Sequence, residues 1–235
     1  MRKGYNVANE KRIVIVKDGP YLVCGTVPLI EELMCTVGEH REYKPGRDLA
    51  QAQTYALCRC GRTKTPPFCD GEHQHYGFDG TETADRRSFA ERAEMFTGPT
   101  LDLLDDQRCA YARFCHRMGS EVWTLTEGSD DPTVREEAIK ASQECPTGRL
   151  VHLDKEQSNR ELEPQLEPEI SVLQDGEKGC SGPLYVKGGI PLISADGTEY
   201  ELRNRYALCR CGESHTMPFC DAAHINFQFQ DDLFT

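Results

Sequence analysis

The chain lacks any long hydrophobic run. None of its apolar stretches approaches the roughly 18 residues that a membrane-spanning helix needs. The opening segment MRKGYNVANEKRIVIV has neither the apolar stretch nor the small-residue cleavage site of a signal peptide. Aromatic residues make up only 8% of the chain, and the mean hydropathy is -0.60. We therefore expect a soluble cytoplasmic protein whose cores are small and depend on metal or disulfide support.

Positive charge is also scarce. The 235 residues include 27 Lys and Arg against 39 Asp and Glu, a net charge of -12. This balance argues against nucleic acid and against an anionic membrane as partners. The length suits two or three small domains.

Cysteine, by contrast, is abundant. The chain holds 12 cysteines, most of them in clusters. In a reducing compartment, clustered cysteines indicate metal binding or catalysis before disulfides.

Two segments repeat each other. YALCRCGRTKTPPFCDGEH (55–73) and YALCRCGESHTMPFCDAAH (206–224) are identical at 13 of 19 positions. Upstream of them, GPYLVCGTVPLI (19–30) matches GPLYVKGGIPLI (182–193) at 7 of 12 positions. Both copies are therefore one structural unit, consisting of a strand, a connection and a Cys/His loop.

The pattern also predicts individual elements. Short β-branched runs predict strands at 11–16, 21–25, 170–174 and 184–188, and a further strand at 149–153. The segment 131–146 predicts a helix capped by Asp130 or Asp131 and ended by Cys145-Pro146. Asp196-Gly197 predicts a hairpin turn in the second connection. The longer first connection, 31–53, is interpreted as an inserted turn or short helix, and 158–169 as a linker.

Each Cys/His loop offers four ligands with the spacing C-x-C-x8-C-x3-H. They are Cys58, Cys60, Cys69 and His73 in the first copy, and Cys209, Cys211, Cys220 and His224 in the second. Cys-x-Cys is tighter than the spacing usual for structural zinc, which remains the alternative. The first two cysteines can reach one iron of a diamond-shaped cluster, and the third cysteine and the histidine the other. Asp70 and Asp221 stand where a helix N-cap would.

These segments resemble the CDGSH iron–sulfur domain of the NEET family. The frame of Cys-x-Cys, Thr63 or Ser214, Pro67 or Pro218, and FCDGEH or FCDAAH carries the resemblance. It implies a 2Fe–2S cluster with three cysteines and one histidine in each copy. A neutral imidazole in place of a thiolate makes the cluster less negative, which favours reduction. Two departures are Glu72, in place of a small polar residue, and Ala222, in place of glycine.

A third group of cysteines lies between the copies. Cys109 and Cys115 flank Ala112, and Cys145 precedes Pro-Thr-Gly. The segment 97–153 resembles the divergent single-cluster bacterial ferredoxins found fused to CDGSH domains. Three thiolates match a 3Fe–4S cluster; a 4Fe–4S cluster with His116 or water as fourth ligand is the rival, and three free cysteines on a helical spacer are the alternative. The other cysteines, Cys24, Cys35 and Cys180, are interpreted as ordinary thiols.

We therefore expect an α+β protein with three parts. These are a first CDGSH half (1–85), a ferredoxin-like α+β insertion (86–157), and a linker with the second CDGSH half (158–235). The two β-rich halves are expected to form an intramolecular pseudo-dimer, and the chain a monomer. The leading hypothesis is a non-enzymatic electron carrier with a redox partner protein. The alternatives are cluster storage, transfer to an apo-acceptor or redox and pH sensing through the His ligands, and, after these, a zinc-stapled interaction module.

Overall fold

The two repeated segments build two equivalent sheets that exchange a strand. A computed structural model describes residues 10–49 and 52–231. The first sheet has the order β14–β1–β2–β5, and the second β15–β13–β12–β3–β4. Their strands are β1 (Arg12–Ile15), β2 (Tyr21–Cys24), β3 (Leu29–Val37), β4 (His40–Asp48), β5 (Thr54–Leu57), β12 (Glu169–Asp175), β13 (Cys180–Lys187), β14 (Leu192–Ile193) and β15 (Arg205–Leu208).

The exchanged strands come from the matching Pro-Leu-Ile segments. β14, from the second copy, pairs parallel with β1, and β3, from the first copy, pairs parallel with β12. The same backbone bond starts each pairing: the Ile13 amide donates to Pro191 (2.9 Å) and the Ile170 amide to Pro28 (2.9 Å). One hydrophobic core contains buried residues from both copies. The expected α+β pseudo-dimer is confirmed, and its halves share strands rather than merely touching.

The expectation for the first connection is wrong. Residues 31–53 contain no helix in their described part; β3 and β4 form a long hairpin there instead. The burial of β3 alternates along the strand, and the turn lies at Gly38, whose φ is 59°. Such alternation is typical of a half-buried strand. The strand predictions at 11–16, 21–25, 149–153, 170–174 and 184–188 are confirmed to within a few residues.

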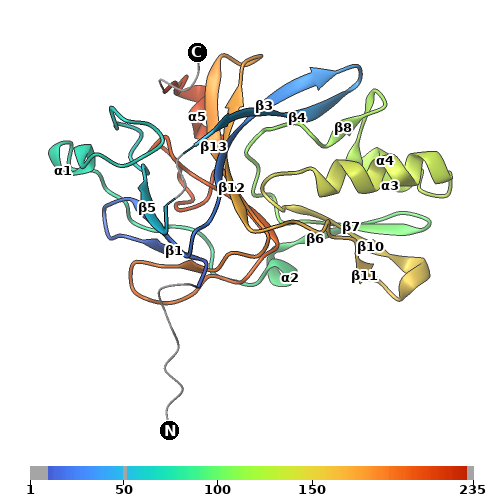
Figure 1. The fold of residues 1–235 in the computed structure, drawn as a ribbon. Helices are drawn as coiled ribbons and strands as arrows, with labels where there is room; N and C mark the ends of the chain where they lie inside the picture. The colour runs from blue at the N-terminus through green and yellow to red at the C-terminus, as the bar shows by residue number, and fades with distance from the viewer. Residues whose placement is uncertain (1–9, 50–51, 232–235) are drawn as a thin grey trace, which may run out of the picture.

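The segment between the copies forms a separate sheet covered by two helices. The sheet has the order β11–β10–β7–β6, and Figure 1 shows helices α3 and α4 packed over it, at the end of the molecule opposite α1. Its elements are α2 (Phe89–Arg92), β6 (Glu94–Thr97), β7 (Leu101–Asp105), β8 (His116–Arg117), β9 (Ser120–Glu121), α3 (Val122–Glu127), α4 (Pro132–Gln143), β10 (Leu150–Asp154) and β11 (Arg160–Glu161).

The helix predicted at 131–146 is confirmed. Asp131 caps α4 by accepting the amides of Thr133 (2.7 Å) and Val134 (3.3 Å), and Pro132 occupies the first turn. The helix ends before Cys145, as the Cys-Pro pair predicts. α4 therefore delivers Cys145 to the point where the central sheet meets the rest of the molecule.

The unexpected hairpin joins the central domain to the second sheet. Arg41 of β4 forms a buried two-pronged ion pair with Asp175 of β12 (both bonds 2.8 Å) and donates to the Ala112 carbonyl (3.1 Å). The ring of Tyr43 stacks on Phe114 with centroids 4.1 Å apart. Thus β4 fixes the chain at 112–114, next to the predicted ligands of the central group.

Candidate iron–sulfur sites

The two Cys/His loops have the same backbone geometry. We call residues 58–73 the first loop and 209–224 the second loop. In the first loop, the Cys58 amide donates to Pro67 (2.8 Å) and the Cys69 amide to Ala56 (2.9 Å). In the second, the Cys209 amide donates to Pro218 (2.8 Å) and the Cys220 amide to Ala207 (3.0 Å). Each loop therefore folds back beside the strand that starts it, which brings its third cysteine next to its first.

The ligands of each loop are arranged as two close pairs. In the first loop, the Cys58 and Cys60 sulfurs lie 3.7 Å apart, and the Cys69 sulfur lies 3.4 Å from His73 Nδ1. The corresponding distances in the second loop are 3.5 Å and 3.4 Å. Within the described residues, no three Cys, His, Asp or Glu side chains gather closely enough to hold one metal ion. Two pairs of donors suit a group with two metal atoms, one for each pair.

Backbone amides favour the charged form of the first cysteine in each loop. The pKa of Cys58 is lowered to about 6, chiefly by the hydrogen bond from the Cys60 thiol and also by the amides of residues 61–63, although burial acts the other way. The pKa of Cys209 is lowered to about 7 by the equivalent donors. Iron is bound by thiolate rather than thiol. The other two cysteines of each loop behave differently: the hydrogen bond to the first cysteine raises the pKa of Cys60 and Cys211, and burial raises the pKa of Cys69 and Cys220, so these thiols must lose their protons on binding iron. The donor types, three cysteines and one histidine in each loop, fit an anionic cluster with two iron atoms.

The aspartates after the third cysteines do not act as N-caps, contrary to expectation. The N-cap residues of α1 (Glu72–His75) and α5 (Ala223–Asn226) are Gly71 and Ala222. Asp70 lies one residue earlier and accepts the amides of Lys64 (2.8 Å) and Glu72 (3.2 Å). Both helices have only four residues, too few aligned peptide units for a substantial dipole. The aspartates therefore tie the loop together rather than direct a helix dipole at the cluster.

The departure at Ala222 strains the second loop. Gly71 has φ 94° and Ala222 has φ 70°, both in the left-handed region that costs an alanine about 1–2 kcal/mol. A methyl group at Gly71 would meet nothing within 4 Å, so conformation alone opposes it.

We expect opposite effects from exchanging these two residues. Gly71→Ala should lower the free energy of unfolding of the loaded protein by about 1 kcal/mol, because alanine takes on the left-handed strain. Ala222→Gly should raise it by about 0.5–1 kcal/mol, because the strain relieved exceeds the added entropy of the unfolded chain. Urea unfolding measures both. If both substitutions changed the free energy of unfolding in the same direction, backbone strain at Ala222 would not be the explanation.

The two loops meet back to back. Cys60 and Cys211 form an antiparallel backbone bridge between the copies. A side chain at Gly61 would collide with the Cys211 carbonyl, and one at Gly212 with the Cys60 carbonyl. Tyr21 of the first copy donates its hydroxyl to the carbonyls of Cys209 (2.8 Å) and Pro218 (3.0 Å). The predicted ligands of the two copies are therefore linked through main-chain atoms.

The three central cysteines line one cavity. Cys109, Cys115 and Cys145 lie around it, together with the rest of the central loop, residues 109–115. Tyr111 and Arg113 have φ 57° and 65°, and the Tyr111 amide points to the Cys109 sulfur (3.2 Å). An amide that points at a cysteine sulfur favours negative charge there. Residues 106–113 form no helix, so this segment is a looped backbone rather than a helical spacer.

The central thiols lie close enough to interact. Burial raises the pKa of Cys115 to about 12, and the neighbouring Cys145 and Cys109 add to the shift. The Thr147 hydroxyl lies 3.2 Å from the Cys145 sulfur. His116, the alternative fourth ligand, lies on the β8–β9 hairpin, half-exposed and 3.8 Å from Glu121, and does not line the cavity. Ala112 lines it but also packs against Phe114 in a buried cluster.

The central loop adjoins the second loop. Ala110, Ala207 and Cys220 form a buried cluster, and the Arg108 guanidinium lies 4.2 Å from the centre of the Phe219 ring. An open groove of about 450 Å³ is lined by both Cys109 and Cys220. Together with the Cys60–Cys211 bridge, this places the second loop between the central and first loops.

Comparison with family models identifies these segments. The model described as "Iron-binding zinc finger CDGSH type" matches residues 18–74 and 181–225. The model "Divergent 4Fe-4S mono-cluster" matches residues 96–155 between them. The chain is a double CDGSH protein with an inserted mono-cluster domain. This iron–sulfur protein matches no curated protein and no solved structure.

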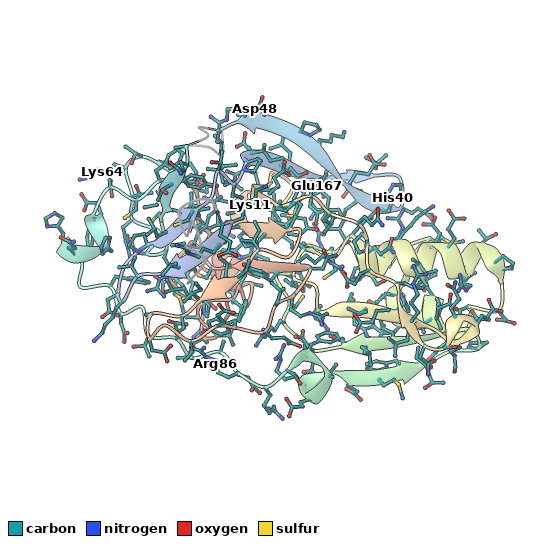
Figure 2. All side chains as sticks on the ribbon, turned by 60° about the horizontal axis from the view of Figure 1, so that its bottom comes forward. Lys11, His40, Asp48, Lys64, Arg86 and Glu167 are labelled. Carbon is teal, nitrogen blue, oxygen red and sulfur yellow. The ribbon has the colours of Figure 1, made fainter. Side chains whose placement is uncertain are left out.

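The unusual Glu72 forms an ion pair with Lys64 (2.6 Å). Figure 2 labels Lys64, close to α1. None of the helices in the described part of the chain has the length and apolar character to cross a membrane. Cys24, Cys35 and Cys180 form no disulfide.

Sequence reasoning missed four arginines that support the sites. Arg59 and Arg210 lie between the two cysteines of each Cys-x-Cys pair and are almost fully buried. Arg41 holds the central loop, as described above. Arg205 of β15 donates to the Cys145 carbonyl (2.9 Å). The presence of arginine in both copies of Cys-Arg-Cys could have indicated a role for Arg59 and Arg210. Nothing in the sequence indicates the roles of Arg41 and Arg205, because they contact residues far away in the chain.

Proposed function

We propose that this protein is a non-enzymatic electron carrier with three clusters in a fixed order. The supporting observation is the sequence of contacts from the central loop, through Cys109 and Cys220, to the second loop, and then across the Cys60–Cys211 bridge to the first loop. The proposed groups are 2Fe–2S in each CDGSH-type loop and 3Fe–4S, or 4Fe–4S, at Cys109, Cys115 and Cys145. Bound there, such clusters accept and donate single electrons.

The chain's own contribution is to hold the three groups rigidly and adjacent. A protein that only stores a cluster does not need a second cluster next to the first. Electron transfer, in contrast, is faster when the distance between two clusters is short. Both CDGSH copies lie on one chain and complete one another's sheets, which supports a monomer. A redox partner protein would then supply or remove electrons at the surface.

Iron and sulfide analysis combined with EPR tests this function. We expect iron and acid-labile sulfide for three clusters per chain, the near-isotropic signal of an oxidised 3Fe–4S centre, and 2Fe–2S signals on reduction. The reduced protein should pass electrons to cytochrome c, a basic one-electron acceptor. A colourless protein with zinc and no iron would refute the proposal and favour the zinc-stapled module.

Unequal exposure favours cluster transfer as a second candidate function, from the first loop only. Cys69 and His73 are half-buried, whereas Cys220 and His224 are each 3% exposed. An acceptor or chelator can therefore reach the first loop's ligand pair more easily.

We expect an iron chelator to empty the first loop before the second. Visible absorbance should decay in two phases, and His73→Cys should slow the fast phase because a thiolate replaces the exposed imidazole. The matched change His224→Cys should leave the fast phase unchanged. A single phase, or a fast phase that responds to His224→Cys, would exclude selective transfer from the first loop.

A further inference from the structure

A narrow cavity lies where the inserted domain meets the second copy. Phe89 of α2 and Thr147 line it from the inserted domain, and Tyr200 and Phe219 line it from the second copy. Ligand pockets occur preferentially at such domain interfaces. The space open to the centres of water-sized groups is about 30 Å³, about twice the minimum that one water needs. The cavity therefore suits a small polar group rather than a large molecule.

Arginines are concentrated around this cavity, although the chain as a whole carries a net charge of -12. The arginines of the lining are Arg86, Arg87, Arg92, Arg108, Arg203 and Arg205. Three guanidinium groups lie over aromatic rings of the same lining: Arg86 over Tyr200 (3.9 Å), Arg108 over Phe219 (4.2 Å) and Arg203 over Phe89 (3.9 Å). Stacking uses the flat face of a guanidinium group, so the N–H donors in its plane remain for other groups.

Two of the six arginines have no carboxylate of their own. The other four form ion pairs: Arg86 with Glu82 (3.3 Å), Arg87 with Asp85 (2.6 Å), Arg92 with Asp106 (2.8 Å) and Arg205 with Glu163. Arg108 approaches the Asp106 carboxylate only at 4.0 Å. In the part of the chain that the structure describes, no carboxylate lies within ion-pair distance of Arg203. Glu201 also lines the cavity, but its carboxylate accepts the Phe89 amide (2.6 Å).

Two further observations favour an anion in the cavity. The Arg92 side chain is 8% exposed, and its buried Nε has no hydrogen-bond partner within residues 10–49 and 52–231. Burial, and after it the charge of Arg92, lowers the pKa of Arg108. Buried donors are normally satisfied, and neighbouring cations repel each other. A bound anion would accept hydrogen bonds here and offset the repulsion.

A cluster in the second loop would account for only part of this positive charge. Cys220 lines both the cavity and the open groove described above, and Arg92 and Arg108 lie with it in both. Arg203 lines the cavity but not the groove. Arg203 is therefore the cation that most clearly indicates a ligand of the cavity itself.

We propose that this cavity binds a phosphate group, either as free phosphate or as part of a small phosphate monoester. The donors come from three segments: Arg92 from α2, Arg108 from the chain before Cys109, and Arg203 from the chain before β15. A phosphate group presents oxygens on several sides, whereas the two oxygens of a carboxylate lie in one plane. The proposal does not depend on which metal the Cys/His loops hold.

The adjoining groove offers room for the rest of a phosphate monoester. It has a volume of about 450 Å³, and Arg92 and Arg108 belong to its wall as well as to that of the cavity. A phosphate group beside these two residues would therefore leave its organic substituent in the groove. Free phosphate would leave the groove to solvent.

Isothermal titration calorimetry of the full-length protein with inorganic phosphate and with phenyl phosphate tests the proposal. We expect saturable binding, and Arg203→Gln should weaken it at least tenfold because one charged donor is lost. Arg62→Gln is the matched control, since the Arg62 guanidinium also lies over an aromatic ring, that of Tyr76 (5.6 Å), but outside the cavity. Arg62→Gln should leave the affinity unchanged.

Urea unfolding gives a second measurement that does not depend on the heat of binding. Phosphate should raise the unfolding midpoint of the wild-type protein, because a ligand of the folded state stabilises it, and should raise that of Arg203→Gln much less. Tighter binding of phenyl phosphate would identify a monoester as the ligand, and equal affinities would identify free phosphate. Absence of saturable binding of both probes would overturn the proposal. An equal effect of Arg62→Gln, or benzoate binding as tightly as phenyl phosphate, would overturn it too.

Discussion

Cys145→Ala should abolish the central cluster and leave both CDGSH-type sites filled. Cys145 lies two residues after the end of α4, is 8% exposed, and shares its cavity with Cys109 and Cys115. A cluster with three thiolate ligands cannot replace one of them with a methyl group. We expect iron and sulfide to fall by the content of one cluster and the 3Fe–4S EPR signal to disappear. The 2Fe–2S signals of the reduced protein should persist.

Cys180→Ala is the matched control for this change. Cys180 is a fully buried thiol at the start of β13, and it lines none of the proposed sites. The same atom is removed from a buried position that holds no cluster, so the iron content should stay at the wild-type level. Equal iron in the two variants would show that Cys145 is not a ligand, and the three central cysteines would then be ordinary thiols.

Arg205→Met should destabilise the protein by about 3–5 kcal/mol, because it breaks a buried charged network. Arg205 forms an ion pair with Glu163 and donates to the carbonyls of Cys145, Ser142 and Leu150. Methionine fills much of the volume but leaves the Glu163 carboxylate without its charged partner and removes one donor from each carbonyl. The Ser142 and Cys145 carbonyls keep backbone donors, the amides of Cys145 (3.2 Å) and Gly148 (3.2 Å). Because the three carbonyls belong to the central domain, urea unfolding should also show that domain losing its structure first.

Arg203→Met is the control two residues earlier in the chain. Arg203 has no carboxylate within ion-pair distance among the described residues, and its guanidinium stacks 3.9 Å from the centre of the Phe89 ring. Losing this contact should cost about 1 kcal/mol or less. Similar losses in both variants would mean that Arg205 stabilises only by packing.

Local patterns predicted the repeated unit well. The duplicated CRC, PFCD and His residues located both Cys/His loops, and Asp131, Pro132 and Cys145-Pro146 located α4 because caps and prolines act on adjacent residues. The ligand assignments themselves remain predictions that the iron analysis tests. In each loop, the two close pairs of donor atoms are the arrangement that a cluster with two iron atoms requires.

Long-range pairing could not be predicted in this way. β3 was misassigned because its strand partner, β12, lies in the other copy, and nothing in the hairpin sequence indicates that pairing. The order of the loops also depends on contacts between residues far apart, such as Cys60 with Cys211. The repeat predicted two equivalent halves, but it did not predict that Arg59 and Arg210, between the cysteines of each pair, are buried.

The strand exchange also constrains how the protein is made. β1 needs β14 as a neighbour, and β12 needs β3, so neither sheet is complete until nearly the whole chain has left the ribosome. Cluster insertion at the two Cys/His loops is therefore expected to follow synthesis rather than accompany it. For the same reason, a protease cut in the charged segment around 162–167 would leave two fragments clasped together. Such a nicked protein would keep its colour and run as one species until denaturant separates the fragments.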